Sequence, residues 1–201
     1  MDTAPECVIL AAGDFPRKGT YARSLLVSAR RVVCCDGAWR ALVRRLGRVP
    51  DVVVGDCDSM GRGVSAAEVV RDAEQETNDL AKAVRLCRRR RWRNPVVLGA
   101  TGGREDHALG NVFRAMEEGL VVVTDSGRFV PFRRRLSVSV APGTPVSVFA
   151  ADPATAMSSK GLEWPLDGVV FANLYCATLN RACADRVVIA TDRPAFVFIA
   201  G

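Results

Sequence analysis

In the stretch Asp51-Val-Val-Val-Gly55-Asp56-Cys57-Asp58-Ser59, an uninterrupted run of three valines follows Asp51, and acidic and small residues follow Gly55. A strand that is apolar on both faces is typical of a parallel sheet with helices on either side. Similar runs recur in the first 125 residues, at 7–12, 31–35, 95–99 and 120–124. The spacing of apolar residues between them predicts helices at 21–29, 38–46, 80–91 and 106–117. A further element is expected at 66–73, where the pattern does not distinguish a helix from a strand. The predicted fold class is therefore α/β, with an N-terminal parallel α/β/α sheet domain.

The pattern changes after Asp125. Short apolar segments then alternate with Gly and Pro turns, at 136–140, 145–150, 169–173, 186–191 and 195–199. This spacing predicts a smaller all-β domain, a sandwich or partial barrel. The predicted domains are residues 1–125 and 126–201, with the boundary near Ser126-Gly127.

Composition excludes several classes of protein. The chain has 201 residues, of which 49% are hydrophobic and 25% charged, with a net charge of +6. This content is too apolar for a disordered chain, and no run approaches the roughly 18 apolar residues of a membrane span. The N-terminus lacks the pattern of a signal peptide, so we expect a cytoplasmic protein without a membrane partner. The seven cysteines include no C-x-x-C pair, which favours reduced thiols over disulfides or a zinc site.

The run Arg88-Arg89-Arg90-Arg91, followed by Trp92-Arg93, is the most basic segment. Such a patch could contact nucleic acid or a polyphosphate. It is also typical of the last turns of a helix, where cations complement the helix dipole. Because no nucleic-acid-binding signature accompanies it, we favour the structural interpretation and expect no nucleic-acid partner.

Acidic residues follow several of the predicted strands. Asp36 comes after 31–35, Asp56 and Asp58 after 51–55, and Asp79 at the start of the helix 80–91. The carboxyl ends of parallel strands meet at one edge of a sheet, where ligands bind. Each Asp alone could cap a turn, but gathered carboxylates repel one another unless a cation is present. Mg²⁺ binds one or two carboxylates together with substrate phosphates, so the sequence favours a metal–phosphate site.

Two further motifs could contact phosphate. Asp79 and Lys82 are three residues apart and share a helix face, either as a stabilising pair or as a metal ligand beside a phosphate-binding ammonium. Gly102-Gly103 precedes the helix 106–117, where backbone N–H groups could approach an anion and Arg104 could add a bidentate contact. The sequence contains no standard P-loop. His107, the only histidine, has no Cys or His partner that would indicate zinc.

Taken in order, the motifs carry a resemblance. They are Asp36-Gly37-Ala38, Gly55-Asp56-Cys57-Asp58-Ser59, Gln75-Glu-Thr-Asn78-Asp79-Leu-Ala-Lys82-Ala, Gly102-Gly103-Arg104-Glu-Asp106-His107-x-x-x-Asn111 and Gly161-Leu-Glu-Trp164-Pro-Leu166. Their order and spacing resemble the thiamine pyrophosphokinase (thiamin diphosphokinase) family over nearly the whole chain. The departures are Cys57 in place of Phe, Asn78 between Thr77 and Asp79, and Leu179-Asn180 in place of Ser-Asn.

The resemblance implies an activity and a set of residues. It implies transfer of the diphosphoryl group of ATP to the hydroxyl of thiamine, with AMP leaving, in a homodimer whose site lies between subunits. Residues 1–125 would be the nucleotide-binding catalytic domain and 126–201 the thiamine-binding domain. The implied catalytic residues are Asp36, Asp56, Asp58, Asp79 and Lys82, of which Asp56, Asp58 and Asp79 would hold Mg²⁺. The implied substrate-binding residues are Gln75, Gly102, Arg104, Asp106, His107, Asn111, Ser158, Ser159, Trp164 and Asn180.

Other functions fit parts of the same pattern. A non-catalytic thiamine or nucleotide sensor could share the fold, but the metal carboxylates that it would lose are present. A magnesium-dependent phosphotransferase for another acceptor would keep the acidic residues without needing Trp164, which suits the cationic ring of thiamine. The sequence leaves open which carboxylate accepts the hydroxyl proton, which nucleotide is preferred and whether Leu179 weakens thiamine binding.

Overall fold

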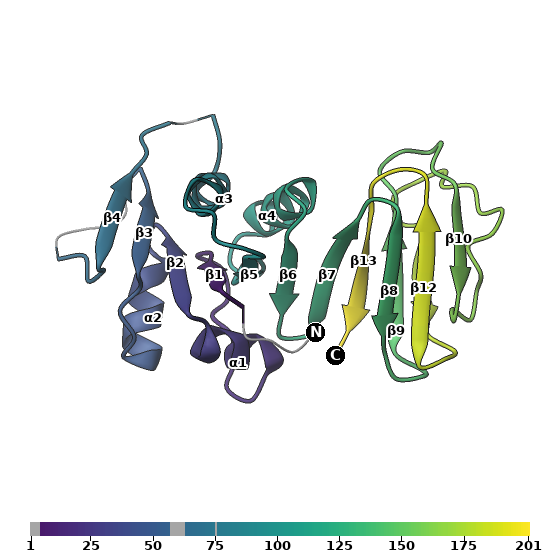
Figure 1. The fold of residues 1–201 in the computed structure, drawn as a ribbon, viewed down its shortest axis with the longest axis horizontal. Coiled ribbons are helices and arrows are strands. Elements are labelled where there is room, and N and C mark those ends of the chain that lie inside the picture. Colours follow the sequence, from purple (N-terminus) through teal and green to yellow (C-terminus); the bar gives the residue numbers. More distant parts are fainter. Residues whose placement is uncertain (1–4, 57–62, 75) are drawn as a thin grey trace. The chain divides into compact units, whose positions relative to one another are not determined.

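The computed structural model describes residues 5–56, 63–74 and 76–201 (Figure 1). The chain divides into two compact units, Met1–Asp125 (unit 1) and Ser126–Gly201 (unit 2).

Unit 1 is built on a parallel sheet with the strand order β6-β5-β1-β2-β3-β4. Each neighbouring pair in this order is parallel, as predicted from the Val-rich runs. The strands are β1 (Cys7–Leu10), β2 (Arg31–Cys35), β3 (Val52–Gly55), β4 (Glu68–Arg71), β5 (Val96–Leu98) and β6 (Val121–Thr124). The central strands β1, β2 and β3 are almost wholly buried, which explains why they show no polar alternation.

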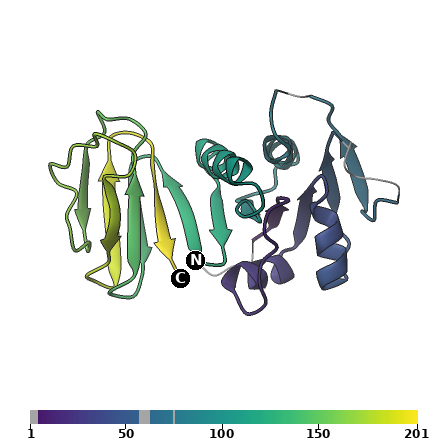
Figure 2. The ribbon, with the colours of Figure 1, turned by 180° about the vertical axis from the view of Figure 1, so that it is seen from behind.

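Helices cover both faces of this sheet. Figures 1 and 2 show α1 and α2 on one face and α3 and α4 on the other. The helices are α1 (Tyr21–Ser28), α2 (Ala38–Leu46), α3 (Asp79–Arg89) and α4 (Glu105–Glu117). On the first face, Leu26 and Leu42 pack with Val8 and Val32 of the sheet in one core cluster. The α/β/α arrangement predicted for this part of the chain is confirmed.

The strand order reverses between β1 and β5, and glycines bring the loops that follow these two strands into close contact. Backbone N–H groups of the first loop donate to the second: Ala11 to Leu98 O (2.8 Å), Gly13 to Gly99 O (2.9 Å) and Asp14 to Thr101 O (2.7 Å). A β-carbon on Gly13 would lie 2.3 Å from Thr101 O, a separation too short for two non-bonded atoms, so the close approach requires glycine. Such a switch point is where open α/β sheets bind ligands, and here it fixes the start of the Gly102-Gly103 segment.

Unit 2 is a sandwich of two antiparallel sheets. One has the order β11-β9-β13-β7 and the other β10-β12-β8. The strands are β7 (Gly127–Phe132), β8 (Arg135–Ser139), β9 (Pro145–Phe149), β10 (Met157–Lys160), β11 (Ala177–Arg181), β12 (Arg186–Thr191) and β13 (Ala195–Ala200). Side chains from both sheets, such as Val148 and Val197 from one and Val187 and Ile189 from the other, form a single core cluster. The predicted all-β character of this part is confirmed.

Some predicted elements are wrong. Residues 169–173 form no strand, because a turn from Leu166 to Val169 leads into a loop that buries Phe171 without pairing. The strands β7, β10 and β11 were not predicted. Helix α3 ends at Arg89 rather than Arg91, since Arg91 takes a left-handed conformation (φ 56°).

In the parts of the chain that are described, no helix is long and apolar enough to cross a bilayer.

Candidate active site

Three aspartates that follow neighbouring elements of unit 1 form its acidic edge: Asp36 after β2, Asp56 after β3 and Asp79 at the start of α3. Gly55 lies between two of them. A β-carbon on Gly55 would come 3.0 Å from Cβ of Asp36 and 3.3 Å from Oδ1 of Asp79. The absence of a side chain at Gly55 therefore lets the two carboxylates approach, as expected from their positions at the ends of parallel strands.

Asp36 is held in an unfavourable environment. It is 8% exposed, its φ is 33°, and its Oδ1 is buried without a hydrogen-bond partner among the described residues. Burial raises the pKa of its carboxyl, and the charges of Asp79 and Asp56 raise it further. Backbone strain and buried unpaired polar atoms are features of functional sites, where a ligand can relieve them.

Lys82 projects from α3 toward the same edge. Its side chain is 2% exposed and its Nζ lies 3.4 Å from Oδ1 of Asp79. Burial raises the pKa of Asp79, while the attraction of Lys82 opposes the rise and Asp56 adds to it. The expected Asp79–Lys82 pair is therefore present, with its ammonium group held out of water beside the acidic edge.

The start of α3 is fixed by Asn78, the residue that departs from the family pattern. Its Oδ1 accepts a hydrogen bond from Ala81 N (3.0 Å), so Asn78 is the N-cap. Its Nδ2 donates to Oδ1 of Asn111 (3.0 Å), and Nδ2 of Asn111 donates to Ala100 O (3.4 Å). Asn111, expected as a substrate-binding residue, thus connects α3 to α4 and to the end of β5. No pattern in the sequence predicts this contact, because the two amides stand in different motifs.

The segment before α4 carries the expected glycines and arginine. Gly102 and Gly103 have φ values of 79° and 70°, and Arg104 is the residue before the helix. Arg104 makes a bidentate ion pair with Asp106 (Nε to Oδ1 3.1 Å, Nη2 to Oδ2 2.6 Å). This contact lowers the pKa of Asp106. His107 is exposed on the first turn of α4. Arg104 is thus paired within its own segment, where an incoming phosphate would compete with Asp106 for it.

The acidic edge has features that suit a divalent cation. Asp36 offers an unpartnered buried oxygen. The charges of Asp79 and Asp56 disfavour the charged form of Asp36, and the charge of Asp56 also disfavours that of Asp79. The described residues contain no group of three or more His, Cys, Asp or Glu side chains gathered as ligands. Asp58 and Gln75, which were expected in the site, lie outside the described residues. The described carboxylates therefore fit a metal held jointly with substrate oxygens better than one enclosed by protein alone.

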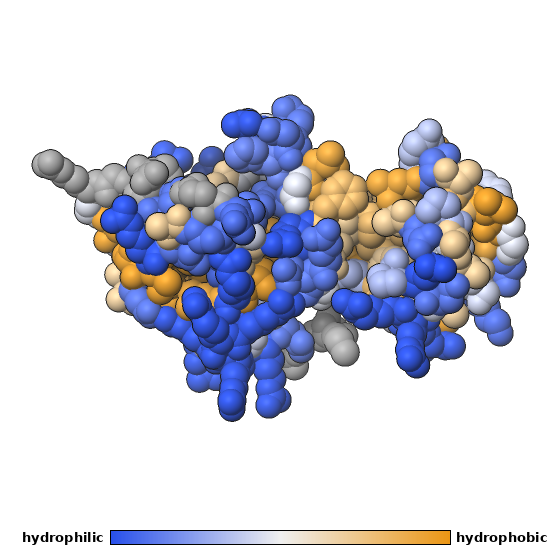
Figure 3. Space-filling model, turned by 90° about the horizontal axis from the view of Figure 1, so that it is seen from above, coloured by the Kyte–Doolittle hydropathy of each residue, from blue (hydrophilic) through white to orange (hydrophobic). Residues whose placement is uncertain are grey.

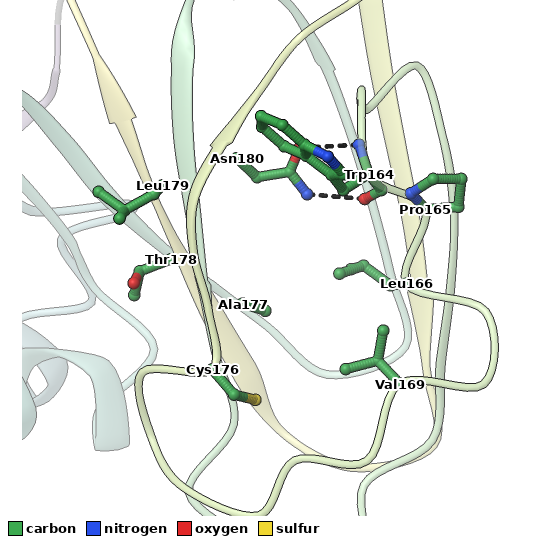
Figure 4. Close-up of a pocket in the computed structure, with 9 residues that line it drawn as sticks. All are labelled: Trp164, Pro165, Leu166, Val169, Cys176, Ala177, Thr178, Leu179 and Asn180. Carbon is green, nitrogen blue, oxygen red and sulfur yellow. Dashed lines mark hydrogen bonds between the residues drawn. The ribbon is translucent and has the colours of Figure 1, made fainter.

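Unit 2 contains an open pocket of about 340 Å³, here called the apolar pocket. Figure 4 shows Thr178 and Leu179 on one side of β11 and Leu166 and Val169 on the other. Trp164, 51% exposed, lies at the upper end of the pocket. The lining residues are Trp164, Pro165, Leu166, Val169, Cys176, Ala177, Thr178, Leu179 and Asn180. Of the residues expected to bind substrate, the pocket brings together Trp164 and Asn180.

Asn180 holds the backbone of Trp164 in place. Its Oδ1 accepts from Trp164 N (3.2 Å) and Arg181 N (2.8 Å), and its Nδ2 donates to Trp164 O (2.7 Å). Its role in the structure is therefore to position the tryptophan. Ser158 is exposed on β10, and Ser159 accepts a hydrogen bond from Leu166 N (2.9 Å). Neither serine is among the residues that line the apolar pocket.

Both units of the chain match models of one protein family. Residues 22–123 match the family model described as thiamin pyrophosphokinase, catalytic domain. Residues 127–198 match the model described as thiamin pyrophosphokinase, substrate-binding domain. The chain belongs to the thiamin pyrophosphokinase family.

Individual relatives agree with this assignment. Thiamine pyrophosphokinase 1 of Oryza sativa subsp. japonica is 28% identical over 205 residues, covering 82% of this chain and 75% of the relative. A thiamin pyrophosphokinase family protein from Enterococcus faecalis superposes with a TM-score of 0.79 at 15% identity, covering 98% of this chain and 99% of that one. For thiamin pyrophosphokinase from Candida albicans the TM-score is 0.76 at 16% identity, with 98% and 89% covered. The chain therefore has the thiamin pyrophosphokinase fold and is an enzyme of this kind.

The basic run lies outside the motifs of the thiamin pyrophosphokinase family, and its described contacts are structural. Arg88 forms an ion pair with Glu118 and Arg90 with Glu68. The guanidinium group of Arg90 also lies 5.2 Å from the centre of the Trp92 ring. These contacts support the interpretation of the run as the end of a helix.

Proposed function

We propose that this chain transfers the diphosphoryl group of ATP to the hydroxyl of thiamine, giving thiamine diphosphate and AMP. The observation that carries the proposal is the acidic edge, with a buried lysine beside it, in a chain of the thiamin pyrophosphokinase family. Transfer of a phosphoryl or diphosphoryl group depends on positioning and on neutralising charge. A buried ammonium group and partly buried carboxylates are suited to that task.

Unit 1 would bind the nucleotide. We propose that Asp56, Asp58 and Asp79 hold Mg²⁺ against the triphosphate, with Asp36 beside them. When bound, the ion would neutralise phosphate oxygens and orient the triphosphate. Lys82 and Arg104 would contact phosphate oxygens, the first from its buried position and the second by exchanging Asp106 for phosphate. The N-terminus of α4 and Gly102 would add backbone N–H groups.

Unit 2 would bind the acceptor. The cationic thiazolium and flat pyrimidine of thiamine suit the face of an aromatic ring, and Trp164 offers one at the apolar pocket. Asn180 supports the proposal because it fixes the backbone of Trp164 through two hydrogen bonds. The proton of the attacking hydroxyl would pass to one of the carboxylates. The cytoplasmic location stays a prediction.

We also propose a homodimer in which unit 1 of one subunit and unit 2 of its partner complete one site. The test is complementation between Asp79→Asn, which we expect to be inactive, and Trp164→Ala, assayed at thiamine concentrations far below the raised KM of Trp164→Ala, where that variant has little activity. After unfolding and refolding as an equal mixture, heterodimers would contain one intact site, so about a quarter of the wild-type sites should return. Activity that stays at the level of the separate variants would contradict a shared site.

The activity itself is tested by measuring AMP release with purified protein, Mg²⁺, ATP and thiamine. We expect thiamine-dependent AMP formation that is lost in Asp58→Asn and in Asp79→Asn. The matched control is Asp185→Asn, which removes an exposed carboxylate of unit 2 and should keep full activity. Thiamine binding without AMP would instead indicate a sensor, and AMP release with another alcohol only would indicate a different acceptor.

A further inference from the structure

We infer that Leu179 is a specificity-determining residue for the acceptor alcohol, forming an apolar wall at the rim of the apolar pocket. The inference rests on the proposed function, because it assumes that the acceptor binds there. Leu179 combines two properties that are unusual for a leucine. Its backbone is left-handed, with φ at 62°, and its side chain is 85% exposed.

The backbone of Leu179 belongs to an irregularity in β11. Ala177 pairs with Val148 and Asn180 with Val146, so β11 advances three residues while β9 advances two. The extra residue re-aims the side chains that follow it. Asn180 turns inward, where it is 5% exposed and bonds the backbone of Trp164. Leu179 turns outward to the rim, on the side of β11 opposite Leu166 (Figure 4).

The stability of unit 2 can account for the irregularity in β11, but it does not account for a leucine at position 179. A left-handed conformation is unfavourable for a residue with a β-carbon, because the β-carbon comes too close to the following carbonyl oxygen. Glycine avoids that cost, and asparagine tolerates the conformation better than leucine. A side chain that is 85% exposed returns little hydrophobic stabilisation. On grounds of stability alone we would expect Gly or Asn at this position, so the leucine is best explained by a contact made when the pocket is occupied.

The surroundings indicate what that contact is. Oγ1 of Thr178 donates to Tyr175 O (2.8 Å), and the amide of Asn180 bonds backbone groups. The polar side chains of Thr178 and Asn180 are therefore engaged within the protein, while the partly buried Val169 presents apolar surface to the pocket. Such a pocket selects by apolar contact and ring stacking more than by side-chain hydrogen bonds. The acceptor class that fits is an alcohol on a planar cationic ring system with alkyl substituents, and thiamine carries ring methyl groups.

The test compares Leu179→Gly, Leu179→Met and the control Val170→Ser. Val170 is 75% exposed in the same unit and does not line the pocket. Steady-state kinetics are measured for thiamine and ATP, with thiamine affinity from tryptophan fluorescence and a thermal melt for each variant.

We expect Leu179→Gly to raise the KM and the Kd for thiamine about 10-fold, the range for one lost apolar group in a pocket. Its KM for ATP should not change, and its melting temperature should be equal or higher. Leu179→Met should stay within about twofold of wild type, and Val170→Ser should not differ from it.

The outcomes separate this inference from the proposed function. An active wild type whose thiamine KM and Kd are unchanged by Leu179→Gly would overturn the role of Leu179 alone. An equal rise in the KM for ATP would also overturn it, since the effect would not concern the acceptor. A wild type without thiamine-dependent AMP release would overturn the proposed function and this inference together.

Discussion

The acidic edge of unit 1 and the apolar pocket of unit 2 are built in opposite ways. At the acidic edge the functional groups are partly or fully buried, and Asp36 and Lys82 are at most 8% exposed. In the apolar pocket the most prominent side chains, Trp164 and Leu179, are exposed and are held through the backbone. Charges need partial exclusion from water to act strongly on phosphate, whereas an aromatic and apolar surface must stay open to receive a ring. We therefore expect substitutions at the first site to change electrostatics and stability, and substitutions at the second to change acceptor binding alone.

The largest expected effect comes from Lys82→Met. Loss of the buried ammonium group should lower kcat about 10²- to 10³-fold, the range for removing one preorganised electrostatic contact. If the acidic edge and the apolar pocket act independently, the affinity for thiamine, measured by fluorescence, should not change. Lys160→Met, at an exposed lysine of unit 2, is the matched control and should keep its kcat. A weakened thiamine affinity in Lys82→Met would show that the acidic edge and the apolar pocket are coupled.

Trp164→Ala should raise the KM for thiamine about 5- to 30-fold, because stacking and cation–π contacts contribute about 1–2 kcal/mol. The free energy of unfolding should change by less than about 1 kcal/mol, since the side chain is half exposed. Kinetics and urea denaturation measure the two quantities on the same preparation. Trp164→Phe keeps an aromatic face and should lose less affinity. A large loss of stability would mean that the tryptophan belongs to the core of unit 2.

Asp36→Asn should stabilise the protein while lowering its activity. The folded-state pKa of Asp36 is raised, so its ionised form opposes folding at neutral pH, and the amide removes that charge. We expect a gain of about 0.5–2 kcal/mol at pH 7, the usual range for a stabilising substitution. The gain should vanish below the ordinary aspartate pKa of about 3.9, where both states of the wild type are protonated. It should grow as pH rises through the raised pKa. Urea midpoints between pH 3 and 7 test this, and a gain that is independent of pH would contradict the electrostatic explanation.

The smallest expected effect is that of Asn78→Ala. Loss of the N-cap should cost about 1 kcal/mol. Asn78→Ser retains a capping oxygen but not the amide that reaches Asn111, so it separates the cap from the connection to α4. Double-mutant cycles with Asn111→Ala, followed by urea denaturation, measure the coupling between the two amides. Additive effects would show that the contact between α3 and α4 contributes nothing to stability.

Much of unit 1 could be predicted from the sequence, because long β-branched runs separated by amphipathic segments have few alternative folds. Unit 2 was harder to predict for reasons that its residues make clear. β10 reads Met-Ser-Ser-Lys and has little apolar signal, and β7 contains Pro131, which normally argues against a strand. β11 contains the extra residue at Leu179, which breaks the two-residue alternation. Conversely, Val169-Val-Phe-Ala-Asn173 has the composition of a strand but buries its phenylalanine from a loop.

The candidate sites also contain some features that could be predicted from the sequence and others that could not. The placement of Asp36, Asp56, Asp79 and Lys82 at one edge could be predicted, because strand ends meet at a known edge of a parallel sheet. The contact between Asn78 and Asn111 could not, since it depends on how two helices pack. Nor could the engagement of Ser159 with Leu166 N be foreseen, because a hydroxyl in sequence gives no sign of whether its partner is backbone or substrate.

The cysteines extend the contrast between the two units to chemical reactivity. The described cysteines of unit 1 are buried, and burial raises the pKa of the Cys34 and Cys35 thiols, which keeps them from forming the reactive thiolate. Cys176 and Cys183 are exposed in unit 2, and of these two Cys176 lines the apolar pocket. Among these described thiols a maleimide would therefore modify unit 2 first. A molecule bound in the pocket would shield Cys176 from the maleimide and leave Cys183 as an internal reference. The ratio of the two labelled peptides in a mass spectrum would then measure how much of the pocket is occupied, without any assay of turnover.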